Sequence, residues 1–165
     1  MIFSRKVISD DYFFTLGVTC LLTKELIDEY YFIIDIENSH IDDVKSILLT
    51  NKRVIIFINE DIDFHMLKNL SGVTLVDKKR DLREILLCLL VNEPKHLYKL
   101  KYKLSNREKE VLSLIAKGLS ETEISERLGI TVNVFYSHRR KLLFKLRIDN
   151  RILLHGAITR RLIEV

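Results

Sequence analysis

This 165-residue chain has little of several residue types that mark particular protein classes. One proline and five glycines leave little room for long flexible or proline-rich segments. The two cysteines, Cys20 and Cys88, stand in apolar runs without metal-ligand spacing, so we expect both to be buried thiols in a reducing cytosol. The start lacks the apolar core and cleavage site of a signal peptide, and no run approaches the roughly 18 apolar residues of a membrane span. These absences predict a cytoplasmic protein without membrane contact.

The sequence also lacks the patterns of catalytic and cofactor sites. No nucleophile is paired with a base, no glycine-rich loop is spaced to cradle a phosphate, and no zinc motif occurs. We therefore expect neither an enzyme nor a bound metal or cofactor. The apolar fraction of 47% is enough for packed cores and too high for a disordered chain.

Positive charge is concentrated in the last part of the chain. Residues 97–165 hold 15 Lys and Arg against 7 Asp and Glu, a balance of +8. The preceding 96 residues hold 12 basic and 16 acidic residues, a balance of −4. A basic segment can neutralise phosphates and an acidic one cannot, which predicts two domains with different tasks.

Residues 1–91 alternate β-branched or aromatic runs with amphipathic stretches. The runs predict short strands, with VIIFIN at 54–59 the strongest signal, and the stretches predict helices. Strands that alternate with helices form a parallel sheet covered by helices, so we expect an α/β domain. The expected strands are 6–9, 30–36, 54–59 and 73–76, and the expected helices are 12–23, 42–49, 63–70 and 79–91.

Residues 92–103, NEPKHLYKLKYK, are the expected linker to a helical domain at 104–165. Pro94 should end the preceding helix at or before Glu93. The four lysines of the linker either add phosphate contacts or are simply solvated. The leucines of 79–91 share one helical face, which is either ordinary core or a dimer contact.

Local chemistry sets the helices of the C-terminal domain. The patterns Ser105-x-x-Glu108 and Ser120-x-x-Glu123 are capping boxes, each of which satisfies free N–H groups at a helix start. Gly129-Ile130 joins the second and third helices in the tight junction of a helix–turn–helix motif. A fourth amphipathic helix is expected at 150–163, so we expect an all-α domain of four helices.

The third helix has two different faces. Phe135, Leu142 and Leu146 follow one another at steps of seven and four residues, which places them on one helical face, and they should face the core. A basic helix behind a tight turn is suited to the major groove of DNA, which predicts a DNA-binding regulator. The opposite face and its flanks carry the residues expected to face DNA: Asn133, Tyr136, Ser137, Arg139, Arg140, Lys141 and Lys145.

The segment from Leu104 to Ile158 resembles the DNA-binding domain of LuxR/FixJ-type (NarL-like) transcription regulators. The resemblance implies a four-helix domain whose third helix enters the major groove, and dimers that form through the fourth helix. It rests on about 55 residues without an insertion, among them Leu104, Arg107-Glu108, Glu110-Val111-Leu112, Ile115-Ala116, Gly118, Ser120, Glu123-Ile124, Leu128, Ile130, His138, Lys145-Leu146 and Asn150-Arg151.

The resemblance places the recognition positions on Tyr136, Ser137 and Arg140, of which Arg140 can bind guanine through two hydrogen bonds. Tyr136 stands where a lysine is common and is either a DNA contact or a plain surface tyrosine. Lys145 is expected on a phosphate. Ser120 and Thr122, at the start of the second helix, are also expected to hold a phosphate. His138 is either packed and hydrogen-bonded or a phosphate contact.

One dipeptide departs from the family pattern. Glu121-Thr122 replaces the Asn-Lys often found at the start of the second helix. The change removes positive charge and should weaken DNA binding by the isolated chain.

The N-terminal domain more faintly resembles a response-regulator receiver. Asp10 and Asp11 match the magnesium-binding pair, Asp35 matches the phospho-acceptor, and Lys78 stands near the lysine that pairs with the phosphoryl oxygens. Asp35 follows Asp11 by only 24 positions, about half the usual gap, so one strand and one helix are expected to be missing. We therefore expect a shortened receiver-like sheet in which Asp35 is a vestige. This arrangement resembles auxiliary regulators of enteric bacteria, which pair with a full-length response regulator.

Three functions are compatible with this sequence. The first is a phosphorylation-independent, nucleoid-associated transcription regulator that binds duplex DNA as a homodimer or with a related response regulator. The second is an interaction protein that sequesters another regulator through its N-terminal domain. The third is a regulator switched by phosphorylation, which the shortened receiver disfavours. The +8 balance and Arg140 favour the first.

Overall fold

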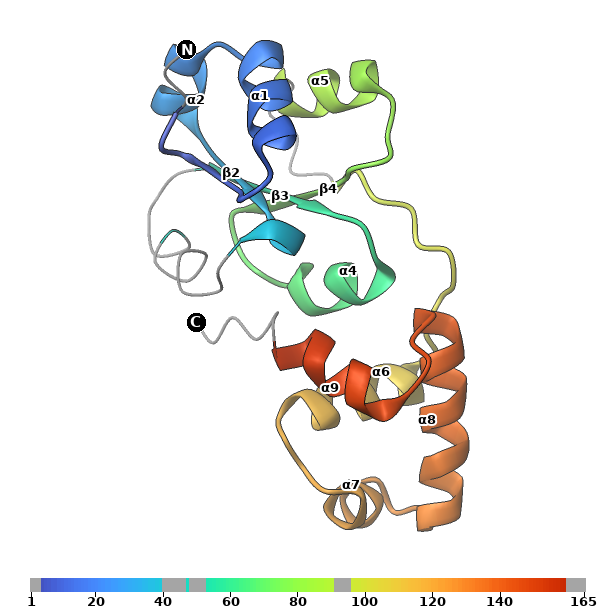
Figure 1. The fold of residues 1–165 in the computed structure, drawn as a ribbon. Coiled ribbons are helices and arrows are strands. Elements are labelled where there is room, and N and C mark those ends of the chain that lie inside the picture. Colours follow the sequence, from blue (N-terminus) through green and yellow to red (C-terminus); the bar gives the residue numbers. More distant parts are fainter. Residues whose placement is uncertain (1–3, 40–46, 48–52, 91–95, 160–165) are drawn as a thin grey trace. The chain divides into compact units, whose positions relative to one another are not determined.

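The computed structural model describes residues 4–39, 47, 53–90 and 96–159. The chain divides into two compact units, residues 1–99 and 100–162. Figure 1 shows strands and helices in the first unit and helices in the second. The fold class expected from the sequence is confirmed.

The first unit is built on a four-stranded parallel sheet in the order β1-β2-β3-β4. Ile33 of β2 is the register partner of both Val7 and Ile55, so the centre of the sheet is apolar. Strands buried on both faces read as continuous hydrophobic runs, which explains the strong signal of 54–59. The strands are β1 (Val7–Ile8), β2 (Tyr31–Asp35), β3 (Arg53–Ile58) and β4 (Val73–Asp77).

Helices cover both faces of this sheet (Figure 1). On one face, α1 (Tyr12–Leu21), α2 (Lys24–Tyr30) and α5 (Leu82–Leu90) bury Val18, Ile27 and Leu89 against the strands. On the other face, α4 (Asp61–Leu67) buries Leu67, and the 3-10 turn η1 (Ile36–Asn38) follows β2. The helix expected at 42–49 lies outside the described residues, apart from Ile47, which is buried in the second core.

Two crossovers of the sheet have opposite hands. The connection from β1 to β2 runs through α1 and α2, and the connection from β3 to β4 runs through α4 on the other face. Each of these connections joins two neighbouring parallel strands, and both move in the same direction across the sheet. Because their helices lie on opposite faces, the two connections have opposite hands. About 98% of such connections are right-handed, so one of these two has the rare hand. Between β1 and β2 the chain forms two helices, α1 and α2, and no strand. The expectation that a strand and a helix are both missing before Asp35 is therefore correct only for the strand.

The segment expected to be one helix at 12–23 contains a break. Leu22 is extended, and the Thr23 hydroxyl accepts a hydrogen bond from the Leu26 N–H at 3.4 Å, which starts α2 as a separate helix. Cys20 lies exposed on α1, so the expectation that it is buried is wrong. Cys88 on α5 is half-buried, and burial raises the pKa of its thiol although Arg53 opposes this.

Part of the expected linker is packed. The Leu97 N–H donates to the Leu75 carbonyl at 2.8 Å, and the Asp77 N–H donates to the Leu97 carbonyl at 2.9 Å. The Tyr98 hydroxyl donates to Asp61 at 2.8 Å. Residues 96–98 therefore lie beside β4 at the edge of the sheet. A linker between the two units must be shorter than the expected 92–103.

The second unit contains the four expected helices. Both capping boxes are present, and Gly129 ends the second helix in the left-handed conformation with a φ of 62°. Phe135, Leu142 and Leu146 are buried, as their spacing predicted. The helices are α6 (Asn106–Ala116), α7 (Glu121–Leu128), α8 (Val132–Leu146) and α9 (Arg151–Thr159).

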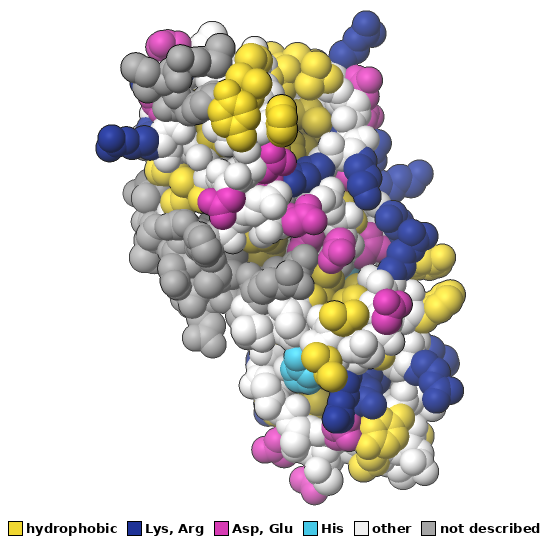
Figure 2. All heavy atoms as spheres, viewed as in Figure 1, with side chains coloured by type: hydrophobic (Ala, Val, Ile, Leu, Met, Phe, Trp, Pro, Cys, Tyr) yellow, Lys and Arg dark blue, Asp and Glu magenta, His cyan; other side chains and the backbone are white. Residues whose placement is uncertain are grey.

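Several large apolar side chains remain on the surface. Figure 2 shows hydrophobic side chains over α1 and α5 in the first unit. Phe13 is 80% exposed and Leu87 is 62% exposed. Among the described residues, no helix is both long and apolar enough to cross a bilayer.

Candidate nucleic-acid interface

The exposed face of α8 carries a row of polar and basic side chains. Asn133, Tyr136, Ser137, Arg140 and Lys141 are all exposed and repeat at intervals of three and four residues. This spacing places them on one side of the helix. The opposite side packs on α6 and α7 through its buried apolar residues. The separation of faces predicted from the sequence is confirmed, and His138 lies half-buried at the border between them.

The turn between α7 and α8 fixes the direction of this face. The Gly129 N–H donates to the Glu126 carbonyl at 3.1 Å, and the Ile130 N–H donates to the Ser125 carbonyl at 3.0 Å. These bonds satisfy carbonyls that the end of a helix leaves free. The Thr131 hydroxyl then accepts from the Val134 N–H at 3.4 Å and caps α8. The two helices are thus joined by three residues, the geometry of a helix–turn–helix motif.

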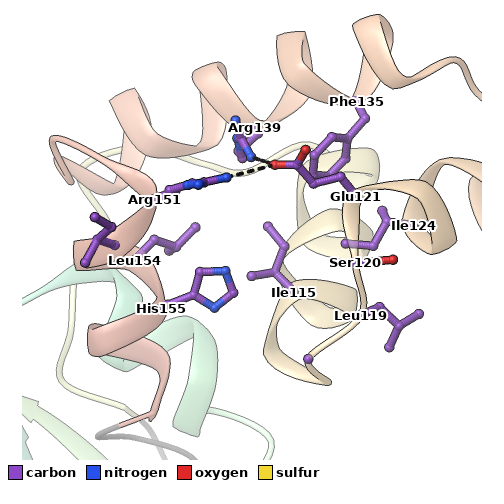
Figure 3. A pocket seen from close by; sticks show the side chains of 12 residues that line it. Ile115, Leu119, Ser120, Glu121, Ile124, Phe135, Arg139, Arg151, Leu154 and His155 are labelled. Carbon is purple, nitrogen blue, oxygen red and sulfur yellow. Dashed lines mark hydrogen bonds and ion pairs between the residues drawn. The ribbon is translucent and has the colours of Figure 1, made fainter.

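Glu121 links three helices beside this face. Its Oε2 accepts a hydrogen bond of 2.5 Å from the Tyr136 hydroxyl, and its Oε1 pairs with the Arg139 guanidinium. Arg151 of α9 approaches the same Oε1 at 3.6 Å. Figure 3 shows Arg139 and Arg151 directed at this carboxylate from α8 and α9. The hydrogen bond from Tyr136, followed by Arg139, lowers the pKa of Glu121, and the same bond raises the pKa of Tyr136.

Arg139 is held inside the domain and does not extend freely toward solvent. Its side chain is 22% exposed. Its guanidinium lies 4.8 Å from the Tyr136 ring centroid and 5.5 Å from that of Phe135, in cation–π contact with both. The ion pair with Glu121 connects α8 to α7, and the two rings, which lie on α8 itself, hold the guanidinium in position. No local sequence pattern predicts this network, because Glu121 is separated from Arg139 by 18 positions.

The start of α7 is already occupied by carboxylates of the chain itself. The Ser120 hydroxyl donates to Glu123 at 2.6 Å and accepts from the Glu123 N–H at 3.3 Å. Thr122 is exposed in the first turn. A phosphate at this helix start would therefore meet the N–H groups and Thr122, but also the negative charges of Glu121 and Glu123.

Lys145, which was expected on a phosphate, is paired with a carboxylate of its own domain. Its Nζ lies 2.7 Å from Oε2 of the buried Glu108 and donates to the Lys103 carbonyl at 3.1 Å. Burial alone would raise the pKa of Glu108, but the bonds from Lys145 and Ser105 outweigh burial and lower it. Lys145 thus fastens the end of α8 to the start of α6, whether or not it also contacts a phosphate.

A pocket of about 470 Å³ lies beside the Glu121 cluster. Its walls are apolar, and its rim carries Glu121, Arg139, Arg151 and His155, as Figure 3 shows. Within the described parts of the chain, no group of three His, Cys, Asp or Glu side chains could hold a metal. The apolar residues of the wall are Ile115, Leu119, Ile124, Phe135, Ile152 and Leu154.

In the first unit, the structure brings Asp35 and Lys78 together. Asp35 is fully buried at the end of β2, and Lys78 Nζ lies 2.6 Å from its Oδ1. The other carboxylate oxygen accepts from Ser9 at 3.2 Å and from Asn38 at 2.9 Å. Asp11 is directed elsewhere, because its side chain accepts from the N–H groups of the first turn of α1 at 2.8 and 3.2 Å. Asp10 is exposed.

The comparison with known sequences covers both units. Residues 102–155 match the family model described as "Bacterial regulatory proteins, luxR family". Over 119 residues, 66% of this chain, the sequence is 30% identical to response regulator protein VraR in each of two strains of Staphylococcus epidermidis. The match covers 57% of VraR, so the chain spans little more than half the length of these relatives.

Solved structures of response regulators are similar at lower identity. RcsB from Salmonella enterica serovar Typhimurium, bound to promoter P1flhDC in the presence of the phosphomimetic BeF3-, is 19% identical with a TM-score of 0.48 over 93% of this chain and 97% of that chain. Full-length FixJ from B. japonicum is 14% identical with a TM-score of 0.40 over 96% of this chain and 97% of that chain. The family match and the helix–turn–helix geometry agree. Residues 102–155 therefore match the luxR family of bacterial regulatory proteins and hold a helix–turn–helix motif, and a four-stranded parallel sheet precedes them in this chain.

Proposed function

We propose that this protein is a sequence-specific DNA-binding transcription regulator of the bacterial nucleoid. The observation that carries the proposal is the exposed row on α8, the second helix of a helix–turn–helix motif in a luxR-family domain. An α-helix fits the major groove of B-DNA, where each base pair presents a distinct set of donors and acceptors. The +8 balance of residues 97–165 supplies the attraction to phosphates that such docking needs.

Within this row, Arg140 is the residue we assign to base recognition. It is exposed at the middle of α8, and its guanidinium can donate two hydrogen bonds to O6 and N7 of a guanine. Asn133, Ser137 and Lys141 flank it on the same face and would add base or phosphate contacts. Tyr136 contributes its ring edge, since its hydroxyl is bonded to Glu121.

Regulation is proposed to be independent of phosphorylation. A phosphoryl acceptor must be open to its donor, but Asp35 is fully buried and bonded to Lys78, Ser9 and Asn38. The magnesium-binding role that the resemblance gave to Asp11 conflicts with its use as the cap of α1. The cluster is better suited to hold β1, β2 and the loop after β4 together than to cycle between two states.

The protein is proposed to act as a dimer on DNA, because one recognition helix reads only a few base pairs. Ile152 and Leu153 of α9 are 75% and 49% exposed and offer an apolar contact. Ile158 of the same helix is buried in the domain core and offers no such contact. The exposed side chains of α1 and α5 offer a second surface, toward another copy or a related response regulator.

The same exposed apolar side chains support the alternative function. An interaction protein that sequesters another regulator needs a surface such as that of Phe13, Leu87 and Leu90. Such a protein would bind DNA weakly and without sequence preference. Measurements of DNA binding therefore separate the two functions.

The test is selection of duplexes from a randomised pool by the full chain, followed by binding measurements. We expect enrichment of a defined sequence, an affinity that falls steeply with salt, and a loss of about 1–3 kcal/mol in Arg140→Ala. Lys109→Ala is the matched control, since Lys109 is exposed on α6 away from the row. Failure to enrich any sequence, or equal binding by both variants, would contradict the proposal.

A further inference from the structure

We propose that Glu121 is a specificity-determining residue of this DNA-binding surface, because its carboxylate withholds Arg139 and Tyr136 from DNA phosphates. The inference rests on the proposed function. It predicts that the chain binds DNA of random sequence less well than its basic charge alone would allow. Binding to the correct sequence, where base contacts compensate, is affected less.

The geometry places one carboxylate against two members of the α8 surface. Glu121 is the first residue of α7, and each of its oxygens has a partner on α8. Both partners were expected on DNA from the sequence. A side chain that is bonded to Glu121 must leave it, or share it, before it can bond to a phosphate.

Charge reinforces this arrangement. Glu121 is ionised at neutral pH, as its ordinary pKa already requires, and its side chain is 34% exposed at the start of α7. The start of a helix attracts anions through its free N–H groups. Here the carboxylates of Glu121 and Glu123 already lie at this helix start, and Glu123 accepts from the Ser120 N–H at 2.7 Å, so a phosphate gains less from this site.

The network also separates non-specific from specific contacts. Arg140 and Lys141 are exposed on the same helix and make no hydrogen bond or ion pair with Glu121, so base reading by Arg140 does not require the network to open. Phosphate contacts by Arg139 do require it. Removal of the charge at Glu121 should therefore favour sequence-independent binding more than sequence reading.

The test uses the full chain and the variant Glu121→Gln, which keeps an acceptor for the Tyr136 hydroxyl but removes the charge. Affinity is measured for the selected duplex and for a scrambled duplex of equal length across a range of salt concentrations. We expect the affinity for scrambled DNA to rise roughly fivefold near physiological salt, and its salt slope to steepen by about 0.9, the value of one additional phosphate contact. The ratio of specific to non-specific affinity should fall.

Two variants serve as controls. Glu126→Gln removes the same charge from an exposed position of α7 outside the network and should leave the ratio unchanged. Glu121→Asp keeps the charge and should retain the salt slope of the natural protein. If circular dichroism shows that Glu121→Gln fails to fold, Glu121→Ala, which removes the charge together with the bonds to both partners and suits a helix, is measured in its place.

The outcomes distinguish this inference from the proposed function. If the natural chain shows no preference for the selected duplex, or Arg140→Ala does not weaken it, the proposed function fails. The natural chain can prefer the selected duplex, and Arg140→Ala can weaken that binding, while Glu121→Gln still has the same ratio of specific to non-specific affinity and the same salt slope as Glu126→Gln. In that case only the role of Glu121 is overturned.

Discussion

Asp35 is a buried carboxylate of the N-terminal domain, and it is bonded to Lys78, Ser9 and Asn38 of the same chain. Asp35→Asn should weaken the contact with Lys78 and lower the stability of this domain by about 1–3 kcal/mol. Affinity for the selected duplex should remain unchanged, because no phosphoryl group is needed. Thermal unfolding and DNA binding measure the two effects. A stable adduct of the natural protein with beryllium fluoride and magnesium, accompanied by altered DNA binding, would refute phosphorylation independence.

The pair of Glu108 and Lys145 predicts a pH-dependent stability. The folded pKa of Glu108 is lowered, so its ionised form stabilises the fold above the ordinary pKa of about 4.3, and this contribution is lost as the pH falls through the folded value. Glu108→Gln should therefore be less stable than the natural protein by about 1–3 kcal/mol at pH 7, and the difference should shrink below about pH 4. Urea unfolding at several pH values measures it. Glu110→Gln, which loses only an exposed ion pair with Arg107, is the control.

Among the elements, α8 ends in an unusual way. Arg147 adopts a φ of 57°, the left-handed conformation that glycine occupies without strain. Arg147→Gly should raise stability by about 0.5–1 kcal/mol, less any loss of its contact with the Tyr102 ring. The midpoint of chemical unfolding measures the change. A lower midpoint would show that the ring contact outweighs the backbone strain.

The accuracy of sequence prediction differed between elements for identifiable reasons. The starts of α6 and α7 could be predicted because each depends on a serine and a glutamate three residues apart. The break between α1 and α2 was missed, since Thr23 caps a helix inside a continuous apolar pattern. The exposed row of α8 followed from helical spacing alone. The Glu121 network did not, because it joins three helices through bonds that no local pattern specifies.

At the scale of the whole molecule, assembly is the next property to test. Ile152→Ser should leave the domain folded, because Ile152 is 75% exposed on α9. If α9 forms the dimer contact, the variant should bind the selected duplex as one subunit and more weakly. Sedimentation of protein with and without DNA measures the stoichiometry. Two subunits on DNA with unchanged affinity would move the contact away from Ile152, and the exposed Leu87 of α5 is then the residue to test.

The central claim, that α8 reads base edges through Arg140, is tested most directly by a loss-of-contact measurement. The natural chain and Arg140→Ala are each titrated against single-base variants of the selected duplex. The natural chain should discriminate one G·C pair by about 1–3 kcal/mol, and Arg140→Ala should lose discrimination at that pair while retaining it at the others. If Arg140→Ala discriminates every position as the natural chain does, α8 does not enter the groove in the way proposed here.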